Sequence, residues 1–214
     1  MQYIKTDTEA WEKYPRYRNW FNKLYVSLML GYDCGPSGTA PTKDGEYVVR
    51  PIYNIMGMGL GAEVKTIKSG DYSKVPPGYF WCEYFKGEQY SATYTFRHEK
   101  KPYWELINCW KGTKPKDNLY KFTKWERSDY APEVPWEFNE LCVIPVINIE
   151  FIGDKVIEVH LRASPDPDYD ELIPIWEDTK KDIDKYTKLG YTYIESFEAS
   201  EGYLRTKRLG FMVK

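Results

Sequence analysis

The sequence predicts an α+β fold with mostly antiparallel sheets, and three observations support this prediction. Aromatic residues make up 17% of the 214 residues, and they favour strands and half-buried faces. Strand-like segments follow one another through short turns, as in hairpins and meanders. Helical patterns at 16–31 and 179–190 flank these strands. Helices separated from runs of strands are typical of the α+β class.

The first helix is expected at 16–31, with one apolar face that packs on a sheet. The residues of that face are Trp20, Leu24, Leu28 and Met29. Gly31 is predicted to end this helix, because a residue with positive φ commonly follows a helix. The second helix, at 179–190, is expected to end at Gly190 for the same reason.

A hairpin and a meander are predicted in the middle of the chain. The strand at 46–54 follows a turn-rich loop at 33–45 and should pair with the strand at 62–67 across a glycine-rich loop. An aromatic meander is then expected over three segments: 79–85, 90–99 and 102–112.

The most apolar part of the chain is predicted to form a second hairpin. Its strands, at 141–153 and 155–164, meet at Gly153-Asp154, a strong hairpin signal because a positive φ costs glycine little. A loop at 164–178 follows. The closing strands are expected at 191–199 and 203–213.

Charge, hydropathy and cysteine content argue against several protein classes. A net charge of -2 gives no general basic field for a nucleic-acid backbone, so a nucleic-acid partner is not expected. No segment approaches the roughly 18 apolar residues of a membrane helix, and the N-terminus lacks the apolar core of a signal peptide. Four widely spaced cysteines with no C-x-x-C pair predict reduced thiols. We therefore expect a single cytoplasmic domain over 1–214 without a membrane partner.

A basic strand and a glycine-rich loop could together bind phosphate. Arg50, followed by Pro51, would point a bidentate cation at phosphate oxygens. Gly57, Gly59 and Gly61 lack Cβ atoms, so their hairpin tip could offer backbone N–H groups to phosphates. Taken alone, these motifs are also typical of an ordinary strand and a tight hairpin, and the glycine spacing is neither the Rossmann nor the Walker pattern.

Two carboxylates interrupt the apolar hairpin. Glu150 and Glu158 lie on its two strands and could converge on a hard divalent cation, which prefers oxygen ligands. The alternative is a pair of ordinary surface acids, but an unpaired carboxylate would be costly to bury in such strands. His160 follows on the same strand, and its imidazole suits softer transition metals better than Mg²⁺ or could hydrogen-bond a phosphate.

In order along the chain, these motifs resemble those of the ATP-grasp family over roughly residues 45–165. The family has a basic residue before Pro, a glycine hairpin, a linker strand E-x-F-x-G-x-E-x-S and a metal strand E-[IV]-N-x-R. The linker positions are Glu83, Phe85, Gly87 and Ser91, with Gln89 at the second acidic position. The metal-strand positions are Glu158 and Arg162, with His160 replacing Asn.

The resemblance implies an ATP-grasp-like fold of two β-rich lobes with flanking helices. Residues 1–80 would hold the first helix and the glycine-rich lid, and residues 81–214 the linker and the metal and phosphate lobe. Implied ATP contacts are Arg50, Gly57, Gly59, Gly61, Glu83, Phe85 and Gln89, with the backbone beside Glu83 reading adenine and Gln89 accepting ribose hydroxyls. Implied metal ligands are Glu150, Glu158 and His160, and the implied catalytic cations are Arg50, Arg97 and Arg162.

The implied activity is an ATP- and Mg²⁺-dependent ligase that joins a carboxylate to an amine through an acyl phosphate. Its expected partners are ATP and a small-molecule or peptide acceptor, with a second copy of the chain as a further candidate. The resemblance extends to uncharacterised compact ATP-grasp proteins encoded by tailed phages, which would place the protein in the host cytoplasm.

Three other functions are compatible with parts of the sequence. Gln89 and His160 depart from the family pattern, which favours an inactive module that binds a nucleotide or a partner protein. Lys43 in TKDGE is similar to the K-x-D-G lysine of nucleotidyl transferases, although the spacing differs by one residue. The aromatic segments 79–85 and 191–197 could stack nucleic-acid bases, but strand aromatics usually serve packing.

Overall fold

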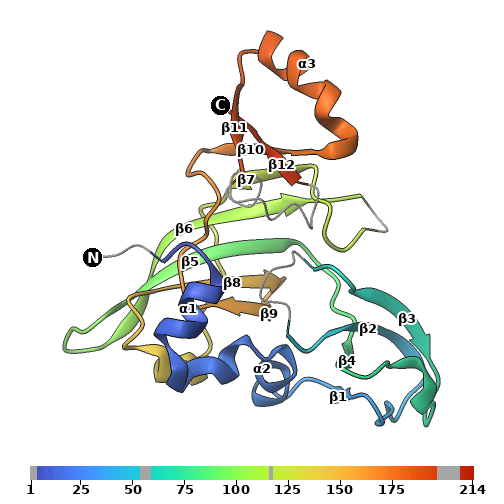
Figure 1. Cartoon of the computed structure of the whole chain (residues 1–214). Helices are drawn as coiled ribbons and strands as arrows, with labels where there is room; N and C mark the ends of the chain where they lie inside the picture. Colours follow the sequence, from blue (N-terminus) through green and yellow to red (C-terminus); the bar gives the residue numbers. More distant parts are fainter. Residues whose placement is uncertain (1–3, 54–58, 116–117, 197–207) are drawn as a thin grey trace.

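The described residues form two antiparallel sheets and a few short helices (Figure 1). The computed structural model describes residues 4–53, 59–115, 118–196 and 208–214. The smaller sheet has the order β1 (Cys34–Pro36), β4 (Tyr79–Glu83), β2 (Gly45–Pro51), β3 (Glu63–Ile67). The larger sheet has the order β11 (Thr192–Glu195), β12 (Arg208–Val213), β10 (Glu171–Trp176), β7 (Lys124–Arg127), β6 (Tyr103–Thr113), β5 (Gln89–Arg97), β8 (Val146–Ile152), β9 (Lys155–His160). The predicted α+β class with mostly antiparallel sheets is confirmed.

The helices are short and lie mainly before the first strand and near the C-terminus. They are α1 (Asp7–Lys13), α2 (Lys23–Met29) and α3 (Ile183–Lys188), with 3₁₀ segments η1 (Pro15–Phe21), η2 (Tyr72–Lys74), η3 (Trp136–Leu141) and η4 (Glu177–Asp182). No helix in the described ranges is long and apolar enough to cross a membrane.

The single helix predicted at 16–31 is wrong in its length, and Leu28 of its predicted apolar face is exposed. The chain forms η1 and then α2, and Asn22 separates them because its side chain accepts a hydrogen bond from the Tyr25 backbone N–H (2.9 Å) and so caps α2. The break changes the helical phase. Val26 is therefore buried, whereas Leu28 is 55% exposed.

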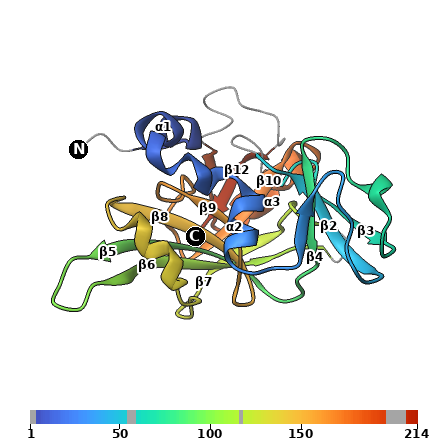
Figure 2. The ribbon, with the colours of Figure 1, turned by 90° about the horizontal axis from the view of Figure 1, so that it is seen from below.

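The predicted packing of this region on a sheet is confirmed. Trp20 is 1% exposed, and its ring meets that of Phe138 with centroids 4.7 Å apart. Both belong to a core that also contains Ile147 and Ile149 of β8 and Leu161 after β9. Figure 2 shows the N-terminal helices beside β8 and β9.

Both predicted hairpins form, but the predicted meander is split between the sheets. β2 pairs with β3, and β8 pairs with β9 around Gly153, whose φ is 59°. β5 pairs with β6 as expected. β4 instead pairs with β1 and β2, so residues 84–88 cross from one sheet to the other. The first strand of the expected meander therefore belongs to the smaller sheet, and the other two belong to the larger sheet.

Two segments predicted as loops contain strands. The turn-rich segment 33–45 includes β1, and the segment 164–178 includes β10. The proline in ELIPIW does not prevent strand formation, because Pro174 pairs only with Phe211 of β12 and lies beyond the two residues that pair with β7. The helix predicted at 179–190 is present as η4 and α3.

Each sheet has its own apolar core. The predicted boundary between two lobes at residue 80 stays a prediction. Tyr47, Val49, Ile67 and Trp81 form the core of the smaller sheet with Val75. The helices before residue 30 contribute to the core of the larger sheet.

Cys34 and Cys82 lie directly opposite each other on β1 and β4. The adjacent pair is hydrogen-bonded through the Glu83 N–H and the Asp33 carbonyl (2.8 Å), so the cysteines occupy a non-hydrogen-bonded position. Opposing Cα atoms at such positions are about 4.5 Å apart, within the range that a disulfide spans.

We expect mild oxidation by a glutathione disulfide to link Cys34 to Cys82. Cys109 should be spared, because its side chain is 1% exposed. Peptide mapping by mass spectrometry without reduction would identify the cross-linked peptide, and Cys34→Ser is the control that removes it. Recovery of only mixed glutathione adducts would contradict this prediction.

Candidate nucleotide and metal site

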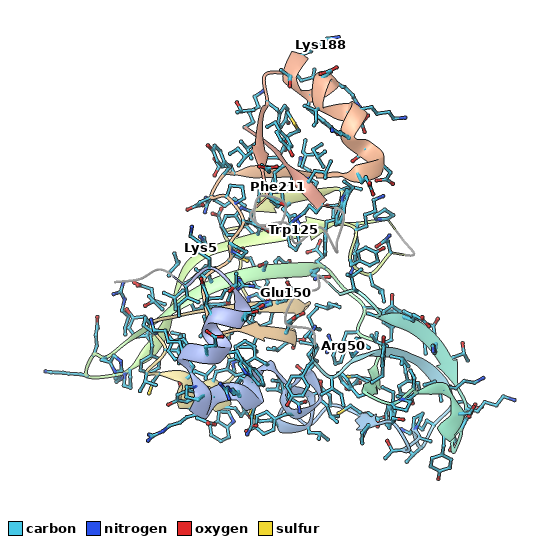
Figure 3. All side chains as sticks on the ribbon, viewed as in Figure 1. Lys5, Arg50, Trp125, Glu150, Lys188 and Phe211 are labelled. Carbon is cyan, nitrogen blue, oxygen red and sulfur yellow. The ribbon has the colours of Figure 1, made fainter. Side chains whose placement is uncertain are left out.

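A cavity of about 500 Å³ lies between the two sheets. Its walls come from β2 and β4 on one side and from β5, β8, β9 and the segment before α1 on the other. Figure 3 labels Arg50 on the smaller sheet, Glu150 on the larger sheet and Lys5 near α1, and all three line the cavity. Nine of the twelve residues predicted for the site line this cavity, although they come from widely separated parts of the chain: Arg50, Gly59, Glu83, Phe85, Gln89, Glu150, Glu158, His160 and Arg162.

Three predicted metal ligands are brought together on β8 and β9. Glu150 pairs directly with Glu158 across the two strands. His160 lies two residues beyond Glu158, and residues two apart on a strand share one face. One ligand atom from each side chain lies within 4.8 Å of the others. The His160 Nε2 is 3.9 Å from Glu150 Oε1 and 3.9 Å from Glu158 Oε1.

Each of these three side chains also forms an ion pair or a hydrogen bond with a residue outside the cluster. The Lys23 ammonium lies 2.9 Å from Glu158 Oε2, and both side chains are largely buried. The Gln89 amide donates to Glu150 Oε2 at 3.2 Å. The other oxygens of both glutamates are the ones that face the His160 Nε2.

His160, the third predicted ligand, contacts a carboxylate near the start of the chain. Asp7 Oδ2 lies 2.9 Å from the His160 Nδ1. The Arg162 guanidinium also contacts this carboxylate, with Nε 2.9 Å from Oδ1 and Nη2 2.9 Å from Oδ2. Asp7 therefore bridges two side chains of the predicted metal strand.

The donor set fits a divalent cation. Two carboxylate oxygens and one imidazole nitrogen converge on one point, and their other polar atoms are engaged by neighbouring groups. Metal ligands in proteins are held in the same way by outer hydrogen-bond partners. An imidazole among carboxylates suits Mn²⁺ or another transition ion at least as well as Mg²⁺.

The metal-free cluster already contains positive charge of its own. Burial acts to lower the pKa of His160, but the adjacent Asp7 carboxylate outweighs it and raises that pKa to about 10. Burial acts to raise the pKa of Glu150, and the hydrogen bond with His160 lowers it overall. The imidazolium is thus the positive charge between the glutamates in the metal-free protein.

The smaller sheet contributes a cationic side chain to the cavity lining. Arg50 lines the cavity, and its guanidinium lies 5.2 Å from the centroid of the Phe80 ring. Its Nε is buried and has no hydrogen-bond partner among the described residues. A buried donor without a partner is costly, so this Nε fits an oxygen of a bound anion such as phosphate.

Two of the three predicted glycines fall within the described part of the loop. Gly59 and Gly61 have φ of 69° and 81°, and Gly59 lines the cavity. A Cβ on Gly61 would stand 2.8 Å from the Tyr79 hydroxyl, so a side chain there would have to displace that tyrosine. Gly57 lies outside the described residues.

The predicted linker residues line the same cavity, and two of them are hydrogen-bonded to other residues of the protein. Glu83 and Phe85 line it, and Glu83 Oε1 accepts a hydrogen bond from the Asp33 N–H (3.3 Å). Gln89 uses both ends of its amide inside the protein: it donates to Glu150, and its oxygen accepts from the Lys114 ammonium at 2.8 Å. The structure thus directs Gln89 to the carboxylate cluster, so its expected contact with a ribose would require this amide to turn.

Arg97 is not brought to the cavity, which corrects the expectation that it contacts a phosphate there. It lies at the end of β5 opposite Gln89, and at about 3.3 Å per residue the strand carries it about 26 Å away. The exposed Arg97 side chain pairs instead with Glu105 on β6.

Three further residues line the cavity that the sequence did not predict for the site: Asp7, Lys23 and Lys114. A T-x-x-E pattern at Thr6 and Glu9 forms a capping box and could have located the start of α1. No local signal links Asp7 to His160, because 153 positions separate them. Lys23 lies within the segment predicted as a helix, and its partner Glu158 belongs to a distant strand.

Comparisons with known proteins give a fold relationship. No protein-family model and no curated protein matches the sequence. N5-carboxyaminoimidazole synthetase from Staphylococcus aureus, solved with ADP, is similar with a TM-score of 0.56 and 10% identity, over 93% of this chain and 68% of the other. An L-amino acid ligase from Bacillus licheniformis has a TM-score of 0.45 and 11% identity, over 68% of this chain. An ATP-grasp superfamily protein from Archaeoglobus fulgidus has a TM-score of 0.40 and 10% identity, over 69% of this chain.

The chain has the ATP-grasp fold, as the similarity over nearly its whole length to the synthetase shows. The chain spans 41% of the Bacillus ligase and 47% of the Archaeoglobus protein. At 10–11% identity this likeness concerns the fold alone.

Proposed function

We propose that this protein is an ATP- and divalent-cation-dependent ligase that joins a carboxylate to an amine. The observation that carries this proposal is the convergence of Arg50, from one sheet, and the Glu150, Glu158 and His160 cluster, from the other, on one cavity. A nucleoside triphosphate needs both a cation for its phosphates and a metal site beside them. ADP in the similar synthetase is consistent with such a ligand.

Each wall of the cavity would bind a different part of ATP. The adenine would lie by the crossing segment at Glu83 and Phe85, where backbone groups can read its edge. Arg50 and the loop at Gly59 would contact the phosphates. The cluster on β8 and β9 would hold Mg²⁺ or Mn²⁺, which when bound neutralises phosphate charge.

The proposed reaction has two steps. A carboxylate oxygen of the acceptor attacks the γ-phosphorus of ATP, the bond to the β-phosphate oxygen breaks, and ADP leaves. An amine then attacks the acyl carbon, inorganic phosphate leaves, and the amine proton passes to solvent. No protein nucleophile is required, so the side chains act by positioning and by charge. Arg162, fixed by Asp7, would lie beside the transferred group.

A binding module without turnover is the second candidate, and one observation favours it. The protonated His160 and Lys23 already place two positive charges against Glu150 and Glu158 in the metal-free protein. In that case a nucleotide could bind without a metal.

Dimerisation and phage origin stay predictions.

Calorimetry with ATP, in the presence and absence of Mg²⁺ or Mn²⁺, tests the proposal. Arg50→Ala should weaken ATP binding by about tenfold or more, roughly 1.4 kcal/mol, because a charge-assisted contact to phosphate is lost. Arg97→Ala is the matched control and should bind ATP like the wild type. Equal affinity in all three proteins would contradict a nucleotide site at Arg50.

Release of ADP with a panel of carboxylates and amines then separates the two candidates. A ligase should release ADP only when an acceptor carboxylate is present. Metal-independent ATP binding without ADP release across the panel would favour the binding module.

A further inference from the structure

The N-terminal helix contributes a buried carboxylate to the larger sheet. Asp7 is 6% exposed, in the first turn of α1. The helix is fixed at its start by the capping box of Thr6 and Glu9, and Ala10 in its next turn is fully buried in the main core. Asp7 therefore has a defined position, although it is 153 residues from the histidine that it contacts.

The contact to Asp7 decides which nitrogen of His160 faces the two glutamates. Asp7 Oδ2 is an acceptor for a proton on Nδ1 at 2.9 Å. The opposite nitrogen, Nε2, is the one directed at Glu150 and Glu158. A carboxylate at one ring nitrogen fixes the ring orientation and the tautomer, and it raises the basicity of the other nitrogen toward a metal.

Asp7 is itself held in place by Arg162. Two contacts of 2.9 Å join the guanidinium to the two carboxylate oxygens. The carboxylate can therefore rotate little without losing one of its partners. These contacts connect α1 with His160 at the end of β9 and with Arg162 just beyond it.

We propose that Asp7 is a positioning residue of the metal site, which holds His160 with Nε2 as a metal ligand and so favours a transition ion over Mg²⁺. The inference rests on the proposed cation-dependent function. Asp7 does not touch the metal in this proposal. It acts through His160, because an imidazole ligand contributes more to binding Zn²⁺ or Mn²⁺ than to binding Mg²⁺.

The chain allows a direct test by nuclear magnetic resonance, because it contains only two histidines. His98 lies outside the cavity lining and serves as an internal reference for His160. In protein labelled with ¹⁵N-histidine and titrated with Zn²⁺ alone, we expect the Nε2 signal of His160 to shift on metal binding while Nδ1 keeps its proton. Because Zn²⁺ displaces the proton on Nε2, the titration is run at neutral and at alkaline pH.

Asp7→Ala should weaken Zn²⁺ binding by about 10- to 100-fold, the usual cost of removing an outer partner of a metal-binding histidine. Its affinity for Mg²⁺ should fall less. Asp7→Asn keeps an oxygen acceptor for Nδ1–H and should lie between Asp7→Ala and the wild type. Glu12→Ala removes an exposed carboxylate from the same helix and should leave both affinities unchanged.

The outcomes separate this inference from the proposed function. Unchanged Zn²⁺ affinity in a folded Asp7→Ala protein, with Nε2 still shifting, would overturn the role of Asp7 and leave the metal site standing. Equal losses for Zn²⁺ and Mg²⁺ would also overturn it, because they would indicate a general structural effect. If the wild type showed no Nε2 shift and bound no divalent ion, the cation-dependent function would fail as well.

Discussion

Glu158→Gln is expected to lower the affinity for ATP in the presence of Mg²⁺ or Mn²⁺ by about tenfold or more, roughly 1.4 kcal/mol. The substitution removes the charge that would bind the cation, while the amide oxygen can still accept a hydrogen bond from Lys23. ATP affinity without metal should change little. Calorimetry with and without the cation measures both effects.

Asp154→Asn is the matched control for this substitution. Asp154 is an exposed carboxylate at the tip of the same hairpin, and it pairs with Lys155 at 3.5 Å. Its replacement should leave metal-dependent ATP affinity unchanged. If Glu158→Gln also bound ATP with undiminished affinity, Glu158 would be an ordinary strand carboxylate.

Lys23→Met is expected to destabilise the metal-free protein by about 3 kcal/mol, near the lower end of the cost of breaking a buried ion pair. The Lys23 and Glu158 side chains are 7% and 16% exposed, so water can replace the ammonium only in part. Methionine retains the apolar stem, which makes the lost charge the main change. Denaturant unfolding in a metal chelator measures the difference in free energy of unfolding.

A second substitution tests the cause of that loss. Lys23→Met combined with Glu158→Gln should recover most of the stability, because no unpaired charge remains. Lys13→Met, at an exposed position of α1, should change the free energy of unfolding by no more than about 0.5 kcal/mol. A Lys23→Met protein as stable as Lys13→Met would show that the ion pair contributes nothing.

The local pattern of the sequence determined the hairpins and the side chains that they present. Gly153-Asp154 between two apolar runs predicted the β8–β9 hairpin, and the pairing of those strands brings Glu150 opposite Glu158. Residues two apart on a strand share a face, so His160 joins them. The turn signal and the alternation of strand faces each depend on only a few neighbouring residues. They can therefore be predicted from the local sequence.

The helical region shows where local pattern was insufficient. The apolar residues at 20, 24, 28 and 29 fit one helical face, but the cap at Asn22 divides the segment and changes the phase. α2 consequently buries Lys23 instead of Leu28. Burial of a lysine depends on a carboxylate from another element, and no periodicity in the helix can indicate that partner.

The tertiary structure alone decided which residues complete the site. Asp7 reaches His160 across 153 positions, Gln89 turns toward Glu150, and β5 carries Arg97 away from the cavity. Sequence motifs give the order of chemical groups along the chain. The distances between groups on different elements depend on how helices and sheets pack, since each buried polar group takes the partner that packing brings within reach.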